Sequence, residues 1–64
     1  MEVFSSNELQ DALRAITSTI GKCEKAQVKL REGTPQYTLT KNRLKAFYVA
    51  VSLINKELEA INHG

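Results

Sequence analysis

Few residues of this chain have side chains that could carry out chemistry, and their spacing argues against a shared site. Cys23 is the only cysteine and lies on an apolar helical stripe, whereas His63, the only histidine, lies near the chain end. A cysteine–histidine pair is therefore not expected. Glu57 and Glu59 fall on opposite sides of a helix, so their carboxylates do not converge. With no glycine-rich phosphate loop and no metal-ligand spacing, we expect no catalytic, cofactor-binding or metal-binding residue, and no enzyme.

The size of the chain favours a protein that depends on a partner. It has 64 residues, and a domain this small buries a modest part of its surface and is marginally stable alone. One cysteine cannot form an internal disulfide, and one cysteine with one histidine cannot form a structural zinc site. A partner is the remaining support.

The sequence also predicts where the protein is found. No segment approaches the roughly 20 apolar residues that span a bilayer. The N-terminal sequence MEVFSSNELQ lacks the basic region and apolar core of a signal peptide. Because a free thiol is compatible with a reducing compartment, we expect a cytoplasmic protein that does not associate with the membrane.

The first helix has a clear start signal. Ser5 and Glu8 have the spacing of a capping box, in which each side chain pairs with the backbone of the other residue. Phe4 and Leu9 flank this cap as the two ends of a hydrophobic staple. These signals predict a helix over residues 6–32.

A short turn then predicts the return of the chain. Gly33 suits the left-handed conformation that ends a helix, and Thr34 can cap the next one. Pro35 fits the first position of a helix, where no amide donor is missed. We expect the turn at 33–34 and a second helix over 35–62, antiparallel to the first, within a single domain that spans 1–64.

Apolar side chains recur in both predicted helices at alternating steps of four and three residues, as in a heptad repeat (abcdefg) with apolar a and d positions. In the first helix this seam comprises Leu9, Leu13, Ile16, Ile20, Cys23, the polar Gln27 and Leu30. In the second helix it comprises Tyr37, Leu44, Phe47, Val51, Ile54, Leu58 and Ile61. The predicted fold class is all-α, an antiparallel, coiled-coil-like two-helix hairpin completed by a partner or by dimerisation.

The two flanks of this seam differ in composition. In an antiparallel pair the g positions of both helices share one side and the e positions share the other. The e and b positions are mostly polar or charged, whereas the g and c positions are rich in alanine, which lets another helix approach closely. This alanine-rich face is the predicted partner-binding surface, with Ala12, Ala15, Thr19, Ala26, Ala46, Ala50 and Leu53 as its candidate residues. Two alternatives remain, namely alanines that simply face water as good helix formers and docking of a second copy.

Charge is unevenly distributed along the chain. Seven basic and two acidic residues lie between Lys22 and Lys45, so the turn end of the hairpin is basic and the open end acidic. Such an end could bind phosphate or an acidic surface. The simpler interpretation is a solvated rim with cations near the C-terminus of the first helix, and we do not expect nucleic-acid binding.

Several features of the whole chain occur together. The heptad-patterned first helix ends in Lys29-Leu30-Arg31-Glu32, a glycine-containing turn follows, and the pair Gln36-Tyr37 opens a second helix whose centre, 46–51, is apolar and interrupted by alanine. In this layout and in length the chain resembles the small helical-hairpin co-chaperones of bacterial type III secretion needles, the YscE-type proteins. The resemblance covers about residues 9–58.

The resemblance implies a cytoplasmic co-chaperone without catalysis. Such a protein pairs with a tetratricopeptide-like chaperone, and the two keep the needle subunit soluble and unpolymerised before export. It supplies no binding residues, so the candidate residues are those of the alanine-rich face. The alternative is a homodimeric four-helix-bundle regulator, or a nucleic-acid-binding protein that uses the basic turn end.

Overall fold

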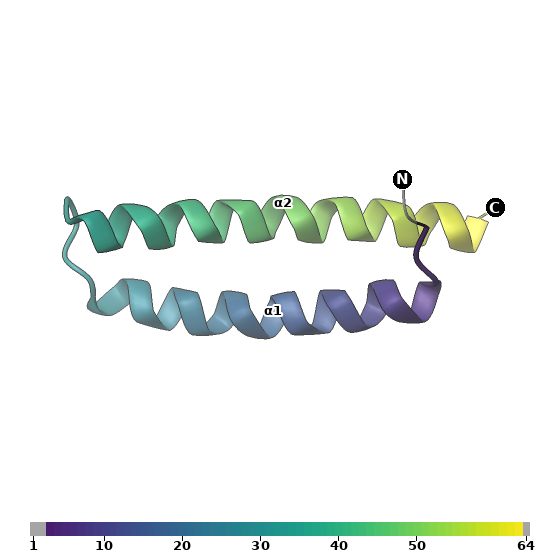
Figure 1. Cartoon of the computed structure of the whole chain (residues 1–64), viewed down its shortest axis with the longest axis horizontal. Coiled ribbons are helices and arrows are strands. Elements are labelled where there is room, and N and C mark those ends of the chain that lie inside the picture. Colours follow the sequence, from purple (N-terminus) through teal and green to yellow (C-terminus); the bar gives the residue numbers. More distant parts are fainter. Residues whose placement is uncertain (1–2, 64) are drawn as a thin grey trace.

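The computed structural model describes residues 3–63, except for the side chain of His63; the remaining residues of the predicted domain, 1–2 and 64, lie outside the described part. It contains two helices, α1 (Ser6–Lys29) and α2 (Pro35–His63). The helices lie side by side and antiparallel, with both chain ends at one end and the turn at the other (Figure 1). The predicted all-α helical hairpin is confirmed.

The start of α1 is fixed by the predicted capping box. The Ser5 Oγ accepts a hydrogen bond from the Glu8 amide at 3.1 Å, and the Glu8 Oε1 accepts one from the Ser5 amide at 2.9 Å. These bonds favour the charged carboxylate, so the pKa of Glu8 is lowered, chiefly by the bond to the Ser5 backbone. The predicted first residue of the helix, Ser6, is confirmed.

The end of α1 differs from the prediction. Leu30 is extended (φ −90°, ψ 145°), so the helix ends at Lys29 rather than at Glu32. The reason is a β-turn, in which the Arg31 carbonyl accepts from the Thr34 amide at 3.2 Å and from the Thr34 Oγ1 at 2.7 Å. Gly33 has a φ of 90°, which a type II turn requires at its third residue. The left-handed glycine is therefore confirmed, but the connection occupies 30–34 instead of 33–34.

The start of α2 agrees with the sequence. The Thr34 Oγ1 accepts from the Tyr37 amide at 3.3 Å, and the Thr34 carbonyl accepts from the Thr38 amide at 3.2 Å. Pro35 is the first helical residue. The same hydroxyl thus closes the turn as a donor and caps α2 as an acceptor, which links the end of one helix to the start of the next.

The seam between α1 and α2 contains the buried side chains in the described part of the chain. Leu9 (8% exposed) and Leu44 (5% exposed) are its only buried side chains. The other predicted seam residues are half-buried, namely Leu13, Ile16, Ile20, Cys23, Gln27, Leu30, Tyr37, Phe47, Val51, Ile54 and Leu58. Ile61 was predicted to join them but is 41% exposed. With 29 residues against 24 in α1, α2 extends past the start of α1 (Figure 1), and Ile61 belongs to the last turn of α2.

The hairpin is long and has a large surface for its mass. It measures 45 by 19 by 18 Å, and its radius of gyration of 14.4 Å exceeds the about 11 Å of a compact domain of this length. Its accessible surface of 5263 Å² compares with about 4100 Å² for a compact monomer of 7.2 kDa. Neither helix within residues 3–63 combines the length and apolar character needed to cross a membrane.

The two internal glycines provide a test of the local backbone. An added Cβ would meet no atom within 4 Å at either Gly21 or Gly33, but only Gly33 has a positive φ. We expect Gly21→Ala to raise the free energy of unfolding by about 1 kcal/mol, because alanine is the better helix former. Gly33→Ala should lower it by about 1 kcal/mol, because alanine is strained at positive φ.

Urea unfolding at one fixed protein concentration measures both changes. A Gly21→Ala variant that is less stable than the wild type would contradict this account of α1.

Candidate functional site

The predicted alanine-rich face is accessible in the hairpin. Leu53 is 60% exposed, and Ala50 is half-buried beside the seam. The Thr19 hydroxyl donates to the Ala15 carbonyl at 2.9 Å, so its proton is satisfied within α1. The remaining candidates are exposed, namely Ala12, Ala15, Thr19, Ala26 and Ala46. Whether a partner binds them stays a prediction.

The opposite flank of the seam is closed by a contact between the helices. The Tyr48 hydroxyl donates to the Glu24 Oε2 at 3.0 Å, the one side-chain hydrogen bond that joins α1 and α2 within residues 3–62. Both residues occupy e positions, which the antiparallel arrangement places on one side. This bond to a carboxylate favours the neutral phenol, so the pKa of Tyr48 is raised. A hydrogen bond therefore joins the two helices on the polar flank.

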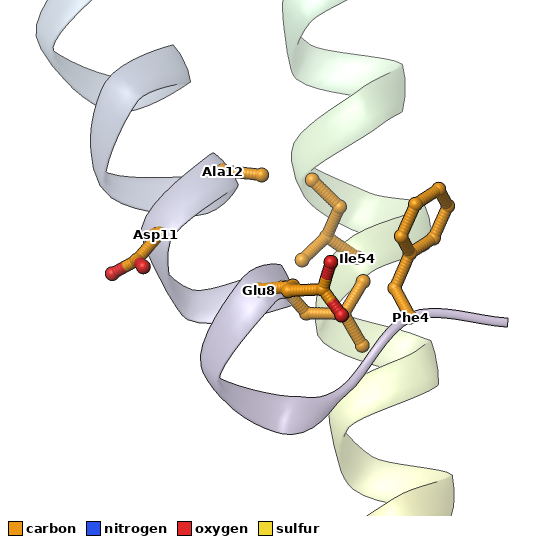
Figure 2. Close-up of a pocket in the computed structure, with 6 residues that line it drawn as sticks. Phe4, Glu8, Asp11, Ala12 and Ile54 are labelled. Carbon is orange, nitrogen blue, oxygen red and sulfur yellow. The ribbon is translucent and has the colours of Figure 1, made fainter.

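On the alanine side, the open end of the hairpin contains a shallow depression of about 450 Å³. Its lining residues are Phe4, Glu8, Leu9, Asp11, Ala12 and Ile54. Figure 2 shows Ala12 and Phe4 on either side of Ile54, while the Asp11 carboxylate points away from them. Ala12 comes from α1 and Ile54 from α2, so the two helices meet here with apolar atoms. Phe4 and Leu9, the predicted staple, both line this depression.

The structure adds two residues that the predicted set omitted. Leu39 (50% exposed) and Val49 (51% exposed) lie on α2 outside the seam. Leu39 precedes Ala46 by seven residues and occupies the same c position, so the heptad spacing could have found it. Val49 occupies an f position, for which the heptad pattern gives no signal. We call Leu39, Ala46, Val49 and Leu53 the outer stripe of α2.

The reactive side chains Cys23, Glu57 and Glu59 do not form a cluster. Cys23 is a free, half-buried thiol in the seam, and Glu57 and Glu59 are both exposed. No group of three or more histidine, cysteine, aspartate or glutamate residues in the described part of the chain could hold a metal ion. The side chain of His63 lies outside the described part, so its distance from Cys23 is not defined.

The basic turn end is an exposed rim. All seven of its basic residues are exposed, namely Lys22, Lys25, Lys29, Arg31, Lys41, Arg43 and Lys45. The one ion pair within residues 3–62 joins Arg14 to Asp11 at 3.4 Å and involves none of them. Tyr37, the aromatic residue nearest the turn, is half-buried in the seam. It is therefore poorly placed to stack on a nucleic-acid base.

Comparisons of the chain with protein-family models, curated proteins and solved structures found no significant match.

The hydrogen bond on the polar flank can be tested by titration. In a Tyr37→Phe background, Tyr48 is the only tyrosine, and its ionisation can be followed by ultraviolet absorbance. We expect Glu24→Gln to move the pKa of Tyr48 down towards its ordinary value of 10.0, because the charged acceptor is lost.

The sign of the stability effect follows from the raised pKa. The contribution of this bond is fully present below pH 10.0 and is lost as the pH rises through the pKa of the folded state. If the pKa of Tyr48 is the same in the Glu24→Gln variant, the Tyr48 hydroxyl does not donate to Glu24.

Proposed function

We propose that this hairpin is a non-enzymatic protein-interaction subunit that docks a helical partner on its alanine-rich face. The observation that carries the proposal is the distribution of apolar residues on α2. Leu44 is buried in the seam at 5% exposure, while Leu39, Val49 and Leu53, outside the seam, are 50–60% exposed. A single helix with apolar residues on two sides is suited to packing between two neighbours.

The small size of the hairpin supports the same proposal. Because only two side chains are buried in the described residues, α1 and α2 gain little apolar burial from each other. A helix laid along Ala46, Ala50 and Leu53 would cover both these residues and the exposed edge of the seam. The alanines permit a close approach of the two helix backbones. Docking would then stabilise the hairpin as well as hold the partner.

We further propose the co-chaperone role that the YscE-type resemblance implies. In this role the partner is a tetratricopeptide-like chaperone, whose surface is built of paired helices. The hairpin would stabilise that chaperone, and the pair would keep the needle subunit soluble and unpolymerised in the cytoplasm. The polar flank that contains Glu24 and Tyr48 would remain in water. The support for this role is the helical architecture and the open alanine-rich face.

Co-expression tests this function. The hairpin is expressed with the tetratricopeptide-like chaperone and the needle subunit of a type III secretion system, and the amount of soluble needle subunit is measured. We expect Leu53→Asp to weaken binding of the chaperone about 10- to 100-fold, because burial of a leucine side chain is worth about 1.5–3 kcal/mol. Ala50→Asp should weaken binding to a similar extent, about 10-fold or more, because it places an unpaired charge in the contact. The yield of soluble needle subunit should fall with it.

Ser52→Asp is the matched control, since it introduces the same charge at an exposed b position beside Leu53. This variant should bind as the wild type does. Full binding by both Leu53→Asp and Ala50→Asp would remove the alanine-rich face from the proposal. Failure of the wild type to bind any such chaperone would remove the co-chaperone role.

A further inference from the structure

We propose that two copies of this hairpin dock through their alanine-rich faces as a symmetric antiparallel dimer, with the two-fold axis passing beside Thr19 and Ala50. This goes beyond the proposed function, because it concerns the state of the hairpin when its helical partner is absent. The occupant of the face is then a second copy. The inference rests on how charge and side-chain size are arranged around these two residues.

On α2 the arrangement around Ala50 is self-complementary. Arg43 lies seven residues before Ala50 and Glu57 seven residues after it, both exposed and both at g positions. An antiparallel copy of α2 centred on Ala50 therefore places Arg43 opposite Glu57 of the second copy, and the two-fold axis repeats the pair. Opposite charges thus face each other twice.

Side-chain size follows the same symmetry on α2. At the c positions, Ala46 lies four residues before Ala50 and Leu53 three residues after it. The antiparallel copy brings Leu53 over the alanine of the other α2, again twice. Leu39 and Ala60 form the next such pair outward. Each exposed leucine of the outer stripe therefore meets a small residue, which leaves room for it to pack.

The face of α1 has an equivalent arrangement around Thr19. Ala12 and Ala26 lie seven residues to either side of it, so small residues meet small residues. At the c positions, Glu8 lies eleven residues before Thr19 and Lys29 ten residues after it, and both are exposed. The second copy brings these opposite charges together. The acidic open end of one hairpin thus lies over the basic turn end of the other.

Contacts between the helices place the two centres near one level along the hairpin, as a single two-fold axis requires. Counting from the hydrogen bond between Glu24 and Tyr48 places residue 53 of α2 level with Thr19. Counting from Ala12 and Ile54, which line one depression, places residue 47 there. Ala50 lies between these two values, three residues or about 4.5 Å of helix from each.

The available area is also sufficient. One long face of the hairpin measures 45 by 19 Å, about 850 Å², and a stable interface buries roughly 800 Å² on each partner. The resulting assembly is a four-helix bundle of two hairpins. Because both occupants use the same face, the helical partner and the second copy would compete for the hairpin.

Charge reversal tests the dimer. Sedimentation should show a wild-type dimer, and Arg43→Glu or Glu57→Arg should each raise its dissociation constant about tenfold or more, because two facing pairs become repulsive. The double variant that carries both changes should recover the dimer. A mixture of the two single variants should form a mixed dimer, because the two acidic side chains of one variant then face the two basic side chains of the other.

Lys45→Glu and Glu59→Arg are the matched controls, since they make the same net-charge changes at exposed b positions. Neither should weaken the dimer, and their mixture should show no preference for mixed dimers. Circular dichroism on each sample shows whether helix content follows dimerisation. A loss of helix in the single variants that is regained in the mixture also supports the proposal.

Three results would overturn it: a wild type that is folded and monomeric, a dimer that ignores both single charge reversals, and single-variant losses that the mixture does not repair. The proposed function is tested separately, because it is measured as binding of the chaperone to the wild type and to Leu53→Asp, whereas the dimer is tested by the charge reversals at Arg43 and Glu57 without the chaperone.

Discussion

Everything in this hairpin depends on one strip of contact, the apolar seam between α1 and α2. In the described residues only Leu9 and Leu44 are buried there, and every other seam side chain keeps part of its surface in water. Hydrophobic stabilisation is roughly proportional to the apolar area removed from water. A two-helix seam removes little of it, because each helix covers only one side of the other. The hairpin therefore has a defined shape but a small reserve of stability.

The two flanks of that seam differ in the side chains that they expose. On one flank Tyr48 and Glu24 join the helices through a hydrogen bond, among side chains that are suited to water. On the other flank small side chains lie beside exposed leucines, and no side-chain hydrogen bond within residues 3–62 links the helices. Polar groups that already have hydrogen-bond partners are stable in water, whereas an exposed apolar surface is stabilised when another molecule buries it. We infer a function that lies in surface recognition.

Competition for one face would give the hairpin a simple form of control. A second copy and a helical partner both offer apolar area to Leu53, but only the second copy must present the arrangement of charge found around Ala50. The apolar contacts would supply most of the binding energy, and the charged residues would select the partner and its direction. Which occupant prevails would depend on concentration and affinity.

The sequence by itself determined the features that depend on a few neighbouring residues: the capping box of Ser5, the positive φ of Gly33, and the heptad spacing that defines the seam. Such features are set by hydrogen bonds within one turn or by the period of the helix. The helical pattern did not reveal where α1 stops, because the hydroxyl of Thr34 closes a local β-turn that leaves residues 30–32 outside the helix, and only the structure showed that turn. The tertiary structure also left Ile61 exposed and placed Val49 on the outer side of α2. The exposure of Ile61 depends on how far α2 extends past the start of α1, and helical periodicity carries no information about that length.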